Sequence, residues 1–193
     1  GMDGGEPVLL TPEDADHDFA RFTLPPTGSS VPSSRLSPSG DFLVDSFSTM
    51  AQAPVMVVRN RDGELVGEVL RADTRRLRAI GWTPPERFVV KAADGETDLH
   101  GVLFKPSAFD ESRRYPVIDQ MYPGPQRRAG PQSFRDNFFP STTFNAQATA
   151  EAGFVVVTLD GRGTTGRDAA FRYAFAGKRD AFGAADHKAA IEQ

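Results

Sequence analysis

A phenol group stands where a buried strand is expected to end. Pro116 cannot donate a ladder hydrogen bond and marks a strand entry, and residues 117–122 then read as a strand that is buried on both faces. The turn signal Pro123-Gly124-Pro125 ends this strand. The Tyr122 hydroxyl could therefore donate a hydrogen bond into a site, or the side chain could simply pack with its hydroxyl in water. Position alone leaves both interpretations open.

A glycine-rich turn follows the clearest buried strand of the chain, F-V-V-V-T-L. Residues 161–166 fit the pattern G-x-G-x-x-G of a dinucleotide-binding turn. However, the segment 171–179 is not strand-like, and the Asp160 carboxylate would lie next to a bound pyrophosphate, so we expect no cofactor. The alternative is structural: Asp160 accepts backbone N–H groups, and a carboxylate braces Arg162. In an open α/β sheet, this turn and Tyr122 lie at the same edge, where active sites are found.

The remaining candidate catalytic groups indicate structural roles. His17 lies in a run of acids and reads as a solvated loop residue, His100 lies in an expected strand, and His187 lies on the last helix. Asp186 precedes His187, but adjacent residues on a helix do not face each other, so we expect no catalytic dyad there. No second ligand stands at metal spacing from a histidine, so we expect no metal site. The pattern G-x-S-x-G of a nucleophile elbow does not occur in the sequence.

Residues 1–82 read as short strands separated by turns. Clusters of Pro, Gly, Ser and Asp recur between short apolar runs. This rhythm is typical of a sandwich, a barrel or propeller blades. The expected strands are Pro7–Thr11, Phe19–Leu24, Phe42–Ser48, Val55–Arg59 and Leu65–Leu70.

Residues 83–193 follow a different pattern. The stiff double proline in Trp82-Thr83-Pro84-Pro85 marks the expected domain boundary. Beyond it, a hairpin signal at Asp94-Gly95 is followed by alternating strands and helices, which predicts α/β architecture with a mostly parallel sheet. A long loop at 123–141 follows one strand end and is typical of a functional segment. The expected strands are Arg87–Lys91, Thr97–Lys105, 117–122 and 154–159. The expected helices are Phe144–Glu151, with Gly153 in the stop position, and Ala184–Gln193.

Composition and charge exclude several classes of function. The 193 residues include no cysteine, which excludes disulfides and thiolate catalysis. Residues 1–80 hold 12 acidic and 8 basic side chains, and residues 81–193 hold 14 of each. There is no basic stripe, so we expect no nucleic acid partner. No apolar run approaches the ~18 residues of a membrane helix, and no signal peptide follows the leading Gly-Met, which resembles an expression remnant. The compartment is not indicated.

Two stretches together resemble the prolyl oligopeptidase family of serine peptidases, in its dipeptidyl-peptidase-like branch. They are Y-P-V-I-D-Q-M-Y-P-G-P-Q, which begins at Tyr115, and A-G-F-V-V-V-T-L-D-G-R-G-T-T-G-R-D, which begins at Ala152. The resemblance covers residues 87–193, and S-P-S-G-D-F-L-V-D-S-F-S further upstream looks like the end of the family's β-propeller. It implies two domains: 1–82 as a β-rich propeller end, and 83–193 as the N-terminal part of an α/β-hydrolase domain.

The resemblance implies peptide-bond hydrolysis through an acyl-serine intermediate, with a peptide as substrate. The family's Ser, Asp and His follow in that order downstream of the matched region, so this chain alone is expected to be inactive. Tyr122 matches the family's tyrosine that donates to the oxyanion, although Pro123 departs from the small residue that many relatives carry. The acidic pair that reads a free amino terminus lies elsewhere in the family's propeller, so dipeptidyl specificity is not carried over. The alternative is a non-enzymatic β-rich interaction module with a degenerate hydrolase half.

The resemblance also implies a sheet order of first, second, fourth and third strand. The strand 154–159 would then lie between 97–105 and 117–122. The strand 117–122 would be an edge with free N–H and C=O groups, through which we expect self-association.

Overall fold

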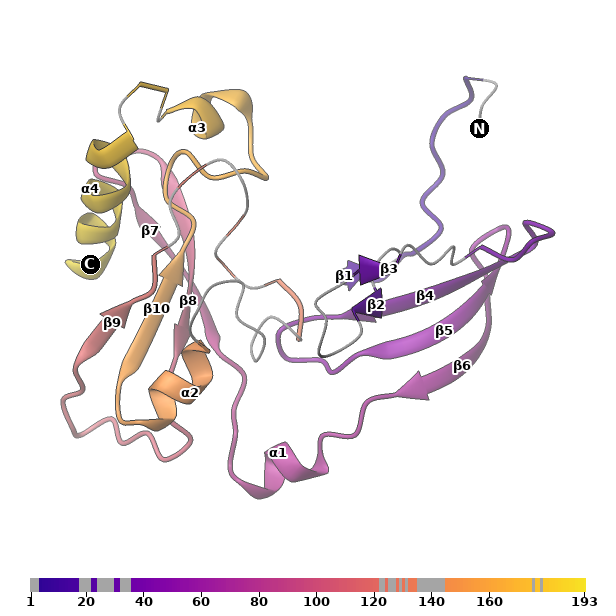
Figure 1. Ribbon diagram of the computed structural model, residues 1–193, viewed down its shortest axis with the longest axis horizontal. Coiled ribbons are helices and arrows are strands. Elements are labelled where there is room, and N and C mark those ends of the chain that lie inside the picture. Colours follow the sequence, from indigo (N-terminus) through magenta and orange to yellow (C-terminus); the bar gives the residue numbers. More distant parts are fainter. Residues whose placement is uncertain are drawn as a thin grey trace. The chain divides into compact units, whose positions relative to one another are not determined.

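The computed structural model divides into two compact units, unit 1 (Gly1–Thr74) and unit 2 (Arg75–Gln193). Figure 1 shows both units, and each is described by itself. The assignment of 1–82 to a propeller end and of 83–193 to a hydrolase domain stays a prediction. The structure describes residues 4–17, 22–23, 30–31, 36–121, 124, 128, 130, 132–134, 145–174, 176–177 and 179–193.

Unit 1 is built on an antiparallel sheet with the strand order β1-β4-β5-β6. The predicted strands at 42–48, 55–59 and 65–70 are confirmed with small changes at their ends. A separate pair joins β2 to β3, and β2 falls within the predicted strand Phe19–Leu24, whose other residues lie outside the described part. The bounds are β1 Asp16–His17, β2 Phe22–Thr23, β3 Ser30–Val31, β4 Phe42–Ser48, β5 Val55–Asn60 and β6 Leu65–Arg71.

The predicted strand Pro7–Thr11 is wrong. These residues have no strand assignment, and the side chains of Val8 and Leu9 are 76% and 78% exposed. β4 instead pairs on this side with Asp16 and His17 of β1. An apolar run needs a ladder partner to become a strand, and this run has none among the described residues.

Unit 2 is built on a four-stranded sheet with the order β7-β8-β10-β9, shown in Figure 1. This is the predicted order of first, second, fourth and third strand. β10 lies antiparallel to β8 and parallel to β9. Because β7 and β8 are also antiparallel, the prediction of a mostly parallel sheet is wrong for the described strands. The bounds are β7 Glu86–Lys91, β8 Asp98–Phe104, β9 Val117–Asp119 and β10 Val155–Leu159.

β9 is shorter than the predicted strand 117–122. It pairs with β10 at Val117, Ile118 and Asp119, and the Gln120 N–H extends the ladder by donating to the Val157 carbonyl at 2.8 Å. Among the described strands, β9 is the edge of its sheet, as predicted.

Two of the helices have side-chain caps at their N-termini. Asn145 and Asp168 act as N-caps for α2 and α3, because their side chains accept backbone N–H groups of Ala148 and Phe171. Gly153 follows α2 with φ of 100°, where the glycine stop was predicted. Two helices, α1 and α3, were not predicted, and α4 begins before the predicted Ala184. The bounds are α1 Arg75–Ala79, α2 Ala146–Glu151, α3 Ala169–Tyr173 and α4 Arg179–Ile191.

The core of unit 2 lies between the sheet and the helices α3 and α4. Ala92, Leu99, Val157, Leu159 and Phe171 are buried together, with Ala190 of α4 packed against them. Gly101 in the centre of β8 is required by close packing: a Cβ atom there would lie 2.2 Å from Cζ of Phe88. The Phe88 ring of β7 therefore lies over Gly101 of the neighbouring strand β8.

Candidate functional site

The turn after β10 is held by a buried ion pair. Asp186 of α4 is fully buried and accepts the Arg162 backbone N–H at 3.0 Å and its Nη2 at 2.7 Å. Asp186 also accepts the Ala93 N–H at 3.1 Å, while Nη1 of Arg162 lies 2.6 Å from Oδ2 of Asp94. The prediction that a carboxylate braces Arg162 is confirmed. Arg162 joins α4 to the β7–β8 hairpin and thereby fixes the turn.

The pKa values of Arg162 and Asp94 are shifted in the directions that keep both side chains charged. The hydrogen bond to Asp186 raises the pKa of Arg162 despite the opposing effect of burial. The backbone N–H groups of Thr97 and Glu96, the Thr97 hydroxyl and the charge of Arg162 lower the pKa of Asp94. The carboxylate and the guanidinium therefore stay ionised at neutral pH, which suits a permanent brace.

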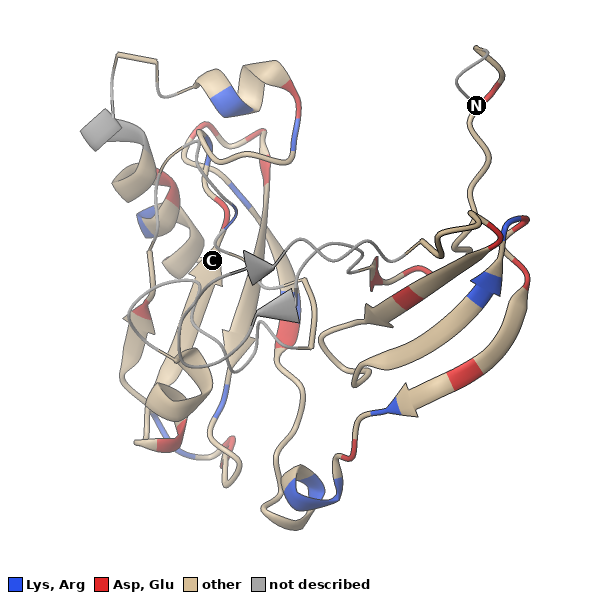
Figure 2. Cartoon of the chain, turned by 45° about the vertical axis from the view of Figure 1, so that its right-hand side comes forward, with Lys and Arg blue, Asp and Glu red and all other residues tan. Residues whose placement is uncertain are grey.

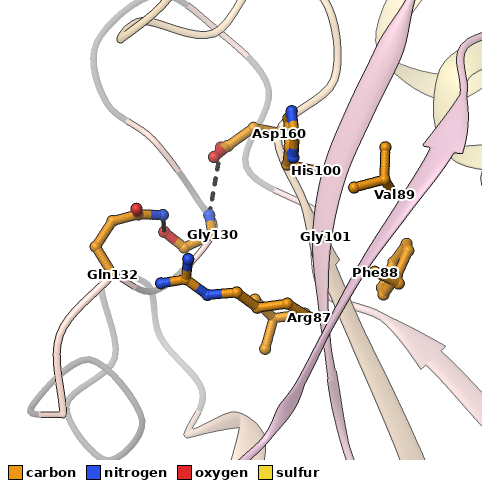
Figure 3. A pocket seen from close by; sticks show the side chains of 9 residues that line it. Arg87, Phe88, Val89, His100, Gly101, Gly130, Gln132 and Asp160 are labelled. Carbon is orange, nitrogen blue, oxygen red and sulfur yellow. Dashed lines mark hydrogen bonds between the residues drawn. The ribbon is translucent and has the colours of Figure 1, made fainter. Parts of the chain in front are cut away.

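Asp160, which follows β10, contacts the long loop at 123–141. Its Oδ1 accepts the Gly130 N–H at 3.3 Å, as Figure 3 shows, and its own N–H donates to the His100 carbonyl at 3.2 Å. A Cβ atom at position 130 would lie 3.0 Å from Oδ2 of Asp160, so this approach favours glycine. The prediction that Asp160 accepts a backbone N–H group is confirmed.

A pocket of about 300 Å³ lies beside Asp160. Figure 3 shows Arg87, His100 and Gln132 around it, together with the backbone of Gly101. The described lining offers both signs of charge and amide groups, but it includes no serine or threonine hydroxyl. The described lining can recognise a polar group and includes no hydroxyl or thiol nucleophile.

His187 makes a contact that the sequence did not predict. Its Nδ1 lies 2.7 Å from Oδ2 of Asp119, with the two side chains 4% and 17% exposed. Asp186, which was expected to form no catalytic dyad with His187, binds Arg162. Asp119 was the available signal, since a carboxylate in a strand that is predicted to be buried on both faces needs a partner. That predicted burial is wrong, because β9 is only partly buried and Val117 is 52% exposed.

His17 of unit 1 was predicted to be a solvated loop residue, and this is wrong. It lies in β1 with an 11% exposed side chain, and its Nδ1 lies 2.9 Å from Oδ1 of the fully buried Asp45. Burial by itself would lower the pKa of His17, but the hydrogen bonds to Asp45 and to the Glu13 carbonyl, with the charges of both acids, raise it. The sequence did not predict this pair because 28 positions separate His17 from Asp45.

Glu13, His17 and Asp45 offer ligand atoms within 4.8 Å of one another. A guanidinium already supplies the positive charge there: Arg59 Nε lies 3.1 Å from Asp45 Oδ2, and its Nη2 lies 2.6 Å from Glu13 Oε1. Figure 2 shows that the sheet of unit 1 carries both acidic and basic positions. This cluster fits an ion-pair network better than a metal site, because a dication would have to displace the arginine.

Tyr122, the predicted oxyanion donor, lies outside the described residues. The structure does describe the strand end that leads to it, through Met121. Of the residues predicted at this edge, the structure describes Asp160, which accepts the Gly130 N–H, and Arg162, which binds Asp186. Among the described residues, no helix has the length and apolar character needed to cross a membrane.

Comparisons with known proteins find similarity to proteins named as dipeptidyl peptidases. No protein-family model matches the sequence. Dipeptidyl peptidase 8 of Mus musculus is 35% identical over 94 residues, which are 49% of this chain and 10% of that protein. Dipeptidyl-peptidase 5 of Schizosaccharomyces pombe is 40% identical over 68 residues, which are 35% of this chain and 9% of that protein.

Solved structures give the same answer over more of the chain. A Bacteroides ovatus protein described as a dipeptidyl aminopeptidase IV superposes with a TM-score of 0.66 and 28% identity, over 81% of this chain and 22% of its own. Dipeptidyl peptidase 4 of Porphyromonas gingivalis superposes with a TM-score of 0.63 and 25% identity, over the same shares. The chain spans 10% of the length of the curated relative named first. The chain is thus a relative of the dipeptidyl-peptidase-like branch of the prolyl oligopeptidase family, as its motifs indicate.

Proposed function

We propose that this chain is part of a serine peptidase that hydrolyses peptide bonds through an acyl-serine intermediate. The nucleophile would lie downstream of residue 193, since no G-x-S-x-G pattern occurs within the chain. In this proposal, residues 1–82 are the β-rich end of a propeller and residues 83–193 are the first part of the hydrolase domain. The substrate would be a peptide.

The observation that carries the proposal is the sheet order β7-β8-β10-β9 together with the braced turn after β10. This order sets the carboxyl ends of the parallel strands β9 and β10 side by side. Active sites of open α/β sheets are built at such ends. The relatives, which are named as dipeptidyl peptidases, support the same class of chemistry.

Tyr122 would donate a hydrogen bond to the oxyanion of the tetrahedral intermediate. In the sequence it follows the last residue of β9 by three positions, and β9 runs parallel to β10, which Asp160 follows. A phenol fixed near the reacting carbonyl stabilises charge that develops only in the transition state, which is how oxyanion donors accelerate acyl transfer.

A non-enzymatic interaction module is the second candidate. The edge strand β6 favours it, because Leu65, Val66, Val69 and Leu70 are each more than half exposed. Exposed apolar side chains on an edge strand are typical of a surface that binds another chain.

Labelling with a fluorophosphonate probe separates the two candidates. The longer protein that contains this chain should be labelled on one serine within a G-x-S-x-G pattern, and the isolated chain of residues 1–193 should not react. A reading frame without that pattern, together with an unlabelled longer protein, would favour the interaction module. Stoichiometric labelling of a serine within residues 1–193 would also contradict the proposal.

A further inference from the structure

We propose that His187 is a positioning residue that fixes the carboxyl end of β9, and with it the Tyr122 phenol, through its hydrogen bond to Asp119. This inference rests on the proposed function, because it assigns His187 a role in that same site. His187 does not touch the substrate in this account. It acts through the strand that leads to Tyr122.

The described ladder at the strand end of Asp119 is short. β9 has three residues and pairs only with β10 among the described strands. An edge strand this short is held on one side by a handful of ladder bonds, which open easily. The Asp119 carboxylate accepts from Nδ1 of His187 at 2.7 and 2.9 Å, and this contact adds a second attachment from the helix layer.

The helix that carries His187 is itself fixed to the opposite edge of the sheet. The side-chain amide of Gln193, just beyond α4, bonds both the N–H and the C=O of Lys91 in β7, at 3.0 and 2.9 Å. Asp186 bonds Arg162 and the Ala93 N–H. Because β7 and β9 are the edge strands of the sheet as far as the structure describes it, α4 and Gln193 join both of these edges through polar side chains.

The His187 ring also lies against the turn after β10. A Cβ atom at Gly161 would lie 3.7 Å from both Cδ2 and Nε2 of His187, so the ring sits at ordinary contact distance from this turn. One side chain therefore contacts the carboxyl end of β9 and the turn that follows β10. These are the two strand ends at which the proposed site is built.

The chain limits how far Tyr122 can lie from this anchor. Three residues span at most about 11 Å, so position 122 is within short reach of Asp119 along the chain. Displacement of a catalytic group by ~1 Å can cost about 100-fold in rate. Loss of the hydrogen bond at Asp119 would reach the phenol as a displacement of this kind.

Substitutions at position 187 test the inference in the longer protein. Asn places its amide nitrogen near the position of Nδ1, Gln places it near the position of Nε2, and Leu offers no donor. His187→Leu and His187→Gln should lower kcat by about 10- to 100-fold with KM little changed, and His187→Asn should recover part of the loss. Lys188→Gln is the matched control, since this neighbour on α4 is 77% exposed and should keep the activity of the unchanged enzyme.

Hydrogen exchange supplies a readout that does not depend on activity. The Gln120 N–H, which bonds Val157, should exchange faster in His187→Leu, while the amides of the β7–β8 ladder keep their protection. Unchanged exchange at Gln120, or faster exchange with normal kcat, would overturn the positioning role. If the longer protein without substitutions shows no peptidase activity, the proposed function is overturned instead. The two failures are therefore distinguishable.

Discussion

Arg162 donates hydrogen bonds to Asp186 from its backbone nitrogen at 3.0 Å, from Nε at 3.0 Å and from Nη2 at 2.7 Å. The acceptor is fully buried, and the side chain of the donor is 14% exposed. The pair therefore fixes the turn after β10 from inside the domain, where neither water nor another side chain can readily replace the arginine.

Arg162→Ala is expected to destabilise unit 2 strongly. The substitution leaves the Asp186 carboxylate buried without its cation, and breaking one side of a buried pair costs about 3–5 kcal/mol. Urea unfolding followed by circular dichroism would measure this loss as a lower midpoint. Arg114→Ala, at an exposed position, is the control and should leave the midpoint nearly unchanged. An equal midpoint for both variants would show that the pair does not hold the turn.

The stability of unit 1 should depend on pH through His17. Its pKa is raised in the folded state, so the contribution is fully present below the unfolded pKa of ~6.5 and is lost as the pH rises through the higher folded pKa. The urea concentration at the midpoint of unfolding should decrease as the pH is raised from about 6 to about 8. His17→Asn should flatten this part of the profile, because asparagine does not titrate. A wild-type profile that rises across this range relative to His17→Asn would contradict the assignment.

β9 is an edge strand among the described residues, and we expect this edge to cause the isolated chain to self-associate. The N–H of Gln120 and the C=O of Pro116 point to β10, so by strand alternation the backbone groups of Val117 point to the open edge. Val117 is 52% exposed, and Val117→Lys places a charge on that edge, which should shift the chain toward the monomer. Analytical ultracentrifugation over a concentration series would measure the shift.

The control for the edge is Ile191→Lys. This substitution adds the same charge and removes an apolar side chain of similar exposure, 53%, from a helix. We expect it to leave the association unchanged. If the chain without substitutions is a monomer, or if the two substitutions have equal effects, β9 is excluded as the surface of association.

The sequence predicted the parts of this fold that depend on local signals or on the family's topology. The Asp94-Gly95 hairpin, the glycine after α2 and the order of the second sheet all follow from such signals. The charged contacts were harder, because their partners are distant in sequence: 68 positions separate His187 from Asp119. A sequence shows that Asp119 needs a partner, but only the packing of α4 on the sheet shows which residue provides it.

Local pattern also failed where pairing decides the structure. Pro7–Thr11 has the composition of a strand, yet the place beside β4 is taken by Asp16 and His17. The fully buried Asp45 accounts for this choice, since His17 and Arg59 both bind it. A buried charge outweighs an exposed apolar run in selecting the register, because leaving the charge without a partner costs more.

The central claim is that the end of β9 leads into the oxyanion site of a peptidase, and Tyr122→Phe in the longer protein tests it most directly. The substitution removes one hydroxyl and keeps the ring. Steady-state kinetics on a peptide amide should show kcat lowered by about 100- to 1,000-fold with KM little changed, because the phenol acts mainly in the transition state. A Tyr122→Phe enzyme with near-normal kcat would return Tyr122 to a packing role and contradict the account.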